Sequence, residues 1–74
     1  MNLDDQKFLV ALGERVRRFR DAQNMTQQEL GRCCRLHRTF VGSVERGERN
    51  VAILNLRKIA KVLRVRLADL LESP

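Results

Sequence analysis

Hydrophobic residues recur along this chain at the three- and four-residue spacing of helices, and no segment alternates hydrophobic and polar residues as an exposed strand does. A first helix is predicted from a cap at Asn2 or Asp4 to about residue 23 or 24, with an inner stripe of Phe8, Leu12, Val16 and Phe19. A later helix has the inner stripe Ile53, Leu56, Ile59, Ala60 and Leu63, and a last short helix covers about residues 67–72.

Two short helices, about 27–34 and 38–46, are predicted in the middle of the chain. The first opens with a capping box, in which Thr26 caps the helix and Glu29 bonds back to the cap. The second ends at Gly47, a residue suited to the position after a helix. A join of only a few residues forces two helices to cross steeply, which is the helix-turn-helix arrangement, and Gly31 supplies the small residue where they touch. The inner faces are Leu30 and Cys34 in the first helix, then Phe40 or Val41, followed by Val44, in the second.

The pattern as a whole predicts an all-α protein with five helices in one small domain, residues 1–74, because 74 residues leave no room for a second domain. No hydrophobic run is long enough for a membrane span or a secretory signal. The two cysteines are neighbours on a helix, so we expect no disulfide between them, with Cys33 exposed and Cys34 in the core. A single histidine and two cysteines do not make a structural zinc site, and we expect a cytoplasmic protein with no metal or cofactor.

The charge of the chain narrows the choice of partner. Lys and Arg total 15 against 9 Asp and Glu, and 12 of the 15 are arginine, whose planar fork binds phosphates and guanine edges. Charge alone fits a solvated basic surface and a polyanion partner equally well. Three Phe, no Trp and no Tyr argue against base stacking on single strands or RNA. No nucleophile–base pair or metal cluster indicates an enzyme.

The segment TQQELGRCCRLHRTFVGSVERGERNVAILNLRKIA resembles the lambda-repressor-like helix-turn-helix proteins of the XRE group. Within that group, RTFVGSVERGERNV followed by LNLRKIA resembles the controller proteins of restriction–modification systems, which are small dimeric regulators. Three positions depart from the usual pattern. Arg35 stands where glycine often makes the turn, His37 where Ser, Thr or Asp caps the second helix of the motif, and Ala52 where Ser or Thr caps the next helix, so that Asn50 is a substitute cap there.

The exposed face of helix 38–46 would enter a major groove with its N-terminus first. The residues expected to contact bases are Arg38, Thr39, Ser43 and His37. The resemblance implies that DNA phosphates are contacted by Gln27, Arg46, Arg49 and Asn50. It further implies a buried ion pair between Arg20 and Glu45 and a dimer contact in residues 64–72, through Leu67, Leu70 and Leu71.

These observations predict a sequence-specific regulator of bacterial or phage origin that binds double-stranded DNA. It would act as a homodimer on a pseudo-palindromic operator, with two recognition helices in successive major grooves about 34 Å apart. RNA polymerase is a further candidate partner. The main alternative is an antitoxin-type or phage or plasmid repressor that also binds a protein. A basic domain for RNA or membrane surfaces ranks last, because no long one-sided basic helix with aromatic anchors is present.

Overall fold

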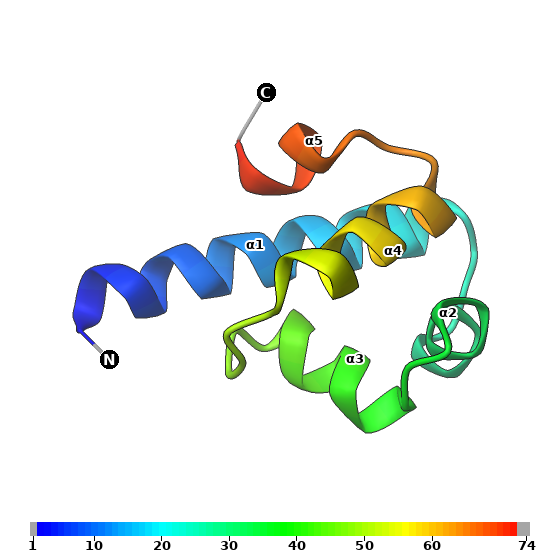
Figure 1. Ribbon diagram of the computed structural model, residues 1–74, viewed down its shortest axis with the longest axis horizontal. Coiled ribbons are helices and arrows are strands. Elements are labelled where there is room, and N and C mark those ends of the chain that lie inside the picture. The colour runs from blue at the N-terminus through cyan, green and yellow to red at the C-terminus, as the bar shows by residue number, and fades with distance from the viewer. Residues whose placement is uncertain (1, 73–74) are drawn as a thin grey trace.

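The computed structural model of the protein describes residues 2–72, and within them every regular element is a helix (Figure 1). The helices are α1 (Leu3–Ala22), α2 (Gln27–Cys34), α3 (Arg38–Glu45), α4 (Ile53–Leu63) and α5 (Leu67–Leu71). The all-α, five-helix class predicted from the sequence is confirmed. The long helix α1 runs across the molecule with α4 beside it, α2 and α3 lie on one side of this pair, and α5 lies on the other (Figure 1).

Local side-chain bonds set where the first two helices begin. Asn2 caps α1, because its Oδ1 accepts the backbone N–H of Asp5 at 2.8 Å. Thr26 Oγ1 accepts the N–H of Glu29 at 3.0 Å, and Glu29 Oε1 accepts the N–H of Thr26 at 3.0 Å, which completes the predicted capping box. Hydrogen bonds to the Glu29 carboxylate from the backbone N–H and the side chain of Thr26 lower the pKa of Glu29.

One hydrophobic core joins all five helices. Its buried members are Leu9, Leu12, Val16, Leu30, Cys34, Val41, Val44, Leu56, Ile59, Ala60, Leu63 and Leu70. The predicted inner stripes are wrong at two places, because Phe8 is 50% exposed and Ile53 is 59% exposed. The start of α1 projects beyond the other helices (Figure 1). Leu9 is buried in the N-terminal part of this helix, whereas its neighbours Phe8 and Val10 are exposed. Ile53 is the first residue of α4, and its neighbours Ala52 and Leu54 are exposed as well.

Leu70 has no exposed surface, so the expectation that it lies in a dimer interface is wrong. The short helix α5 packs against both α1 and α4 and inserts Leu70 between them. Arg15 of α1 also holds α5 in place, because its Nη1 donates a hydrogen bond to the Leu70 carbonyl at 3.1 Å. Leu67 and Leu71, expected in the same interface, are half-buried against the core. Much of the hydrophobic surface of α5 is therefore buried within the protein's own core.

Two glycines allow backbone contacts that sequence periodicity does not predict. A Cβ at Gly13 would lie 2.3 Å from the Val44 carbonyl oxygen, so α1 and α3 touch backbone to backbone at this point. Gly47 follows α3 with φ +73°, as its place after the helix predicts, and a Cβ there would lie 2.6 Å from Val10 Cα. These approaches fix α3 against α1, and the fixed position of α3 is what presents its outer face to solvent.

Candidate nucleic-acid interface

The turn between α2 and α3 is tight. Leu36 donates its N–H to the Gly31 carbonyl at 2.8 Å, and a Cβ on Gly31 would lie 2.5 Å from the Leu36 carbonyl oxygen. Arg35, which the sequence marked as a departure from glycine, adopts the left-handed conformation, with φ 59° and ψ 39°. The left-handed conformation costs a residue with a side chain roughly 1 kcal/mol, and Arg35 adopts it nonetheless.

The N-terminal end of α3 is exposed and rich in polar side chains. His37, Arg38 and Thr39 are all exposed there. His37 caps the helix, because its Nδ1 accepts the N–H of Thr39 at 3.1 Å and lies 2.8 Å from Thr39 Oγ1. The imidazole thus forms the cap at the position where Ser, Thr or Asp is usual. Arg38 has no paired side chain among residues 2–72, and its guanidinium is available to a ligand.

Ser43 was expected to contact a base, and the structure places it elsewhere. It is 8% exposed, its Oγ donates to the Phe40 carbonyl at 2.7 Å, and the same oxygen accepts the Arg49 Nε–H at 3.0 Å. The hydroxyl is therefore engaged inside the protein, and we remove Ser43 from the set of base contacts. Position 43 lies on the α3 face that turns toward the α3–α4 loop, which the sequence alone does not define.

Behind the exposed face, α1, α2 and α3 meet in a polar network. Arg20 donates from Nε and Nη2 to the two carboxylate oxygens of Glu45, at 2.6 and 2.9 Å, and both residues are buried. The expected ion pair is thus present as a two-pronged contact. Gln27 joins it, because its Nε2 donates to Glu45 Oε1 at 3.0 Å. Gln27 is the first residue of α2, so the network ties the start of α2 to the end of α3. The hydrogen bond to Glu45 raises the pKa of Arg20 above its ordinary value.

The other end of α3 bears two arginines that were expected to contact phosphates. Arg46 and Arg49 are both exposed. Arg46 Nε donates to Glu48 Oε2 at 3.0 Å, an ion pair in which both side chains are more than half exposed. The Arg49 guanidinium carbon lies 4.9 Å from the centre of the Phe40 ring. Sequence reasoning missed Phe40 and Glu48 as neighbours of these arginines, although Phe40 was considered for the inner face and Glu48 lies two residues from Arg46.

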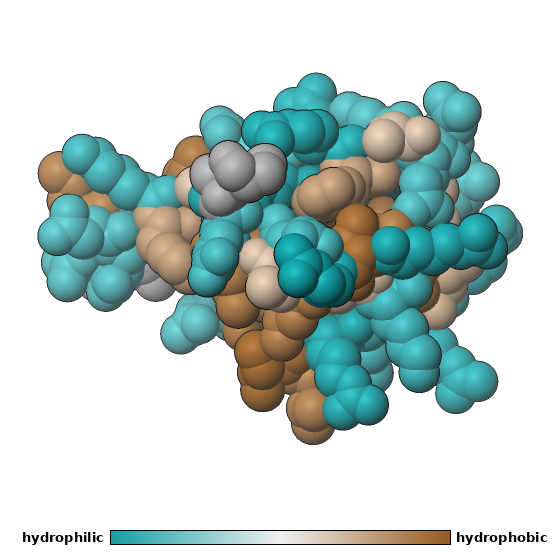
Figure 2. All heavy atoms as spheres, turned by 90° about the horizontal axis from the view of Figure 1, so that it is seen from above, coloured by the Kyte–Doolittle hydropathy of each residue, from teal (hydrophilic) through white to brown (hydrophobic). Residues whose placement is uncertain are grey.

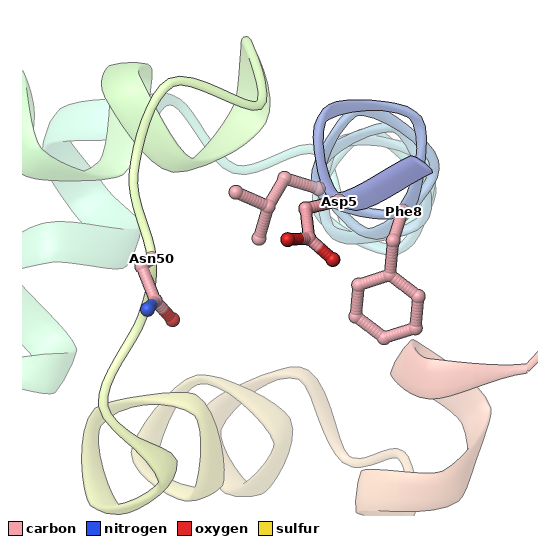
Figure 3. A pocket seen from close by; sticks show the side chains of 4 residues that line it. Asp5, Phe8 and Asn50 are labelled. Carbon is pink, nitrogen blue, oxygen red and sulfur yellow. The ribbon is translucent and has the colours of Figure 1, made fainter. Parts of the chain in front are cut away.

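Asn50 does not cap α4 as expected. The start of α4, at Ala52, has no side-chain cap, so Asn50 is not a substitute cap. Asn50 instead lines a cavity of about 260 Å³ with Asp5, Phe8 and Leu9 (Figure 3). Figure 3 shows the Asn50 amide and the Asp5 carboxylate both pointing into this space from the loop and from α1. A carboxylate beside it repels a phosphate, and we therefore leave Asn50 out of the phosphate contacts.

The fold and this surface have counterparts among known proteins. The family described as Helix-turn-helix matches residues 16–70, which covers α2 to α4 completely, the C-terminal part of α1 and most of α5. The chain belongs to the helix-turn-helix family. This finding confirms the fold class and the family that the motif TQQELGRCCRLHRTFVGSVERG indicated.

Named relatives of this helix-turn-helix chain include controller proteins. It is 46% identical over 61 residues to "Control protein C.BamHI" of Bacillus amyloliquefaciens, covering 81% of this chain and 75% of that one. It is 45% identical over 60 residues to "Control protein C.SmaI" of Serratia marcescens, covering 81% of this chain and 71% of that one. These matches confirm the resemblance to controller proteins that RTFVGSVERGERNV and LNLRKIA indicated.

Solved structures agree with the helix-turn-helix fold. The restriction-modification controller protein C.AhdI of Aeromonas hydrophila matches with a TM-score of 0.86 and 39% identity, covering 90% of this chain and 97% of that one. The hypothetical transcription factor NHTF of Neisseria matches with a TM-score of 0.87 and 39% identity, covering 96% and 82%. One of these structures is thus titled as a controller protein and the other as a hypothetical transcription factor.

Two other classes of site were tested against the structure. Within residues 2–72, no group of three or more His, Cys, Asp or Glu side chains lies close enough together to hold a metal ion. None of the helices in that part of the chain combines the length and the hydrophobicity that crossing a membrane requires.

Proposed function

We propose that this helix-turn-helix protein is a sequence-specific regulator of transcription that binds double-stranded DNA through the N-terminal end of α3. The observation that carries the proposal is the free, exposed Arg38 at the first residue of α3, beside the exposed Thr39. A helix presented this way fits a major groove, and arginine bonds the O6 and N7 atoms of guanine in pairs. The Thr39 methyl suits the thymine methyl group.

Phosphate contacts on either side of α3 would set the position of the protein on DNA. Gln27 opens α2, where the backbone N–H groups of the first turn have no partner within the helix and the helix dipole favours an anion. The Gln27 side chain is already fixed by Glu45, so its remaining N–H is held in one orientation. Arg46 and Arg49 serve the opposite side. In this arrangement the residues of α3 recognise the base sequence, and the residues on either side of α3 bind the DNA backbone.

A single helix of this length reads few base pairs, and we propose that two copies bind a pseudo-palindromic site together. Since Leu70 belongs to the monomer core, the contact between copies needs another surface. Ile53 and Leu54 are 59% and 64% exposed at the start of α4, directly after the loop that bears Arg49. A two-fold contact at these residues would leave both α3 helices facing one side of the pair. Figure 2 shows hydrophobic side chains gathered at one edge of a largely hydrophilic face.

Selection of bound sites from random duplex DNA tests this function. We expect a two-fold repeated half-site with a spacing of about one helical turn between centres. Arg38→Ala should lose the preference for the selected site over random DNA by about 1–3 kcal/mol per half-site while keeping much of its non-specific binding. Arg18→Ala is the matched control, an exposed arginine on α1 away from α3. An unchanged preference in Arg38→Ala would remove this residue from base recognition.

The dimer is tested by sedimentation of Leu54→Arg beside Leu3→Arg. The two leucines are almost equally exposed, at 64% and 63%, and each lies in the first turn of its helix. We expect Leu54→Arg alone to yield a folded monomer. A monomer from Leu3→Arg alone would place the contact on α1. Transcription in vitro from the selected site would then separate repression from activation, and activation would imply a contact with RNA polymerase in the cytoplasm of the host.

A further inference from the structure

Three residues around the end of α3 form a contact that we call the Arg49 clamp, made of Phe40, Ser43 and Arg49. Phe40 and Ser43 lie three residues apart, on neighbouring positions of one face of α3. Arg49 comes from the loop between α3 and α4. Its guanidinium carbon lies 4.9 Å from the centre of the Phe40 ring, within the range of a cation–π contact.

Ser43 fixes the rotation of the guanidinium over the ring. Its Oγ accepts the Arg49 Nε–H at 3.0 Å, and its own O–H is donated to the Phe40 carbonyl at 2.7 Å. The hydroxyl is therefore held in one orientation, and it is only 8% exposed. Of the nitrogens of Arg49, Nε alone has a partner among the described residues, which leaves both terminal amino groups unpaired.

We propose that Phe40 and Ser43 are positioning residues that hold Arg49 with its two terminal amino groups ready for one DNA phosphate. This rests on the proposed function, in which Arg49 contacts the DNA backbone. A guanidinium with one face on a ring and Nε bonded keeps a free edge of parallel N–H groups, and that edge matches two oxygens of a phosphate. An unclamped arginine would lose rotamer freedom on binding, whereas the clamped side chain has lost it before binding.

The dependence of DNA affinity on salt separates a residue that contacts a phosphate from one that positions the contacting residue. The slope of log affinity against log salt concentration counts the phosphates that the protein neutralises, at about 0.9 per phosphate on duplex DNA. Arg49→Ala removes one contact and should flatten the slope by about that amount for each bound protomer. Phe40→Leu and Ser43→Ala keep the charge, so the slope should stay while the affinity falls about two- to tenfold per protomer at every salt concentration.

The experiment measures binding of a random-sequence duplex at several salt concentrations, because phosphate contacts act on any sequence. Phe40→Tyr is the matched control, since it keeps the ring and should bind like the native protein. Phe40→Leu should cause no further loss when Arg49 is already alanine, because the ring would then have nothing to hold. In the free protein, NMR of the Arg49 Nε–Hε group should show a ring-shifted proton that Phe40→Tyr retains and Phe40→Leu loses.

The outcomes separate this proposal from the one on which it rests. If Arg49→Ala flattens the slope while Phe40→Leu and Ser43→Ala bind like the native protein, the clamp is overturned and the phosphate contact stands. An equal loss from Phe40→Leu with and without Arg49 would overturn it too, because the ring would then act on DNA or on the fold directly. Failure of the native protein to bind any duplex would overturn both proposals.

Discussion

Replacing Glu45 with Gln should lower the free energy of unfolding by about 3 kcal/mol, because it leaves the Arg20 charge buried without its partner. Glu45 is 8% exposed and Arg20 9%, so water reaches neither well. Glutamine keeps the shape of the side chain and one accepting oxygen but not the charge. Arginine cannot escape the cost by losing a proton, because its pKa lies far above neutrality.

The size of this loss in stability depends on the contacts that Arg20 retains in the variant. Breaking a buried ion pair typically costs about 3–5 kcal/mol. We take the lower end because Arg20 Nη1 also donates to the Met25 carbonyl at 2.7 Å and lies 3.2 Å from Asp21 Oδ1. Asp21 is mostly exposed, so its compensation is screened by water. A domain of this size is typically stable by about 4–11 kcal/mol, so the expected loss is a large share of the total.

Urea unfolding followed by far-UV circular dichroism measures the effect. Glu48→Gln is the matched control, because it makes the same chemical change in an ion pair whose two side chains are 59% and 58% exposed. That control should cost less than about 1 kcal/mol. Adding Arg20→Met to Glu45→Gln should recover part of the loss, since no buried charge then remains. Equal losses in Glu45→Gln and Glu48→Gln would refute the reasoning.

Four further outcomes are expected at Gly13, Glu48 and the two cysteines. Gly13→Ala should lower stability by about 1–3 kcal/mol in the same urea assay, because its Cβ would lie 2.3 Å from a backbone oxygen of α3, and native-like stability would contradict that close contact. Glu48→Gln should raise affinity for any duplex about two- to fivefold in a binding titration, since it frees Arg46 and removes a charge that repels phosphate; a gain on one sequence only would argue against this. Burial raises the pKa of Cys34 to about 11, so iodoacetamide at pH 8 should modify Cys33 quickly and Cys34 only on unfolding, as mass spectrometry would report. With the thiol pKa raised, the contribution of Cys34 to stability is complete below its ordinary value near 9 and should be lost as the pH rises through 11, a loss that Cys34→Ala would lack.

The sequence predicted the local features of this protein well. The start of α2 follows from the Thr26 capping box, and the end of α3 follows from Gly47, because caps and turns depend on residues within a few positions of each other. The ion pair of Arg20 with Glu45 was predicted by resemblance, since periodicity does not bring together residues 25 positions apart.

Only the tertiary structure decided which face of each helix is covered. Spacing shows that Leu67, Leu70 and Leu71 share a hydrophobic side of their helix. The packing of α5 on α1 and α4 determines that Leu70 belongs to the core. The same holds for Ser43. Helical spacing allowed this residue on the DNA side of α3, but in the folded protein the α3–α4 loop brings Arg49 against its hydroxyl. The physical reason is that helical periodicity fixes relative directions within one element, whereas burial depends on how distant segments are placed around it.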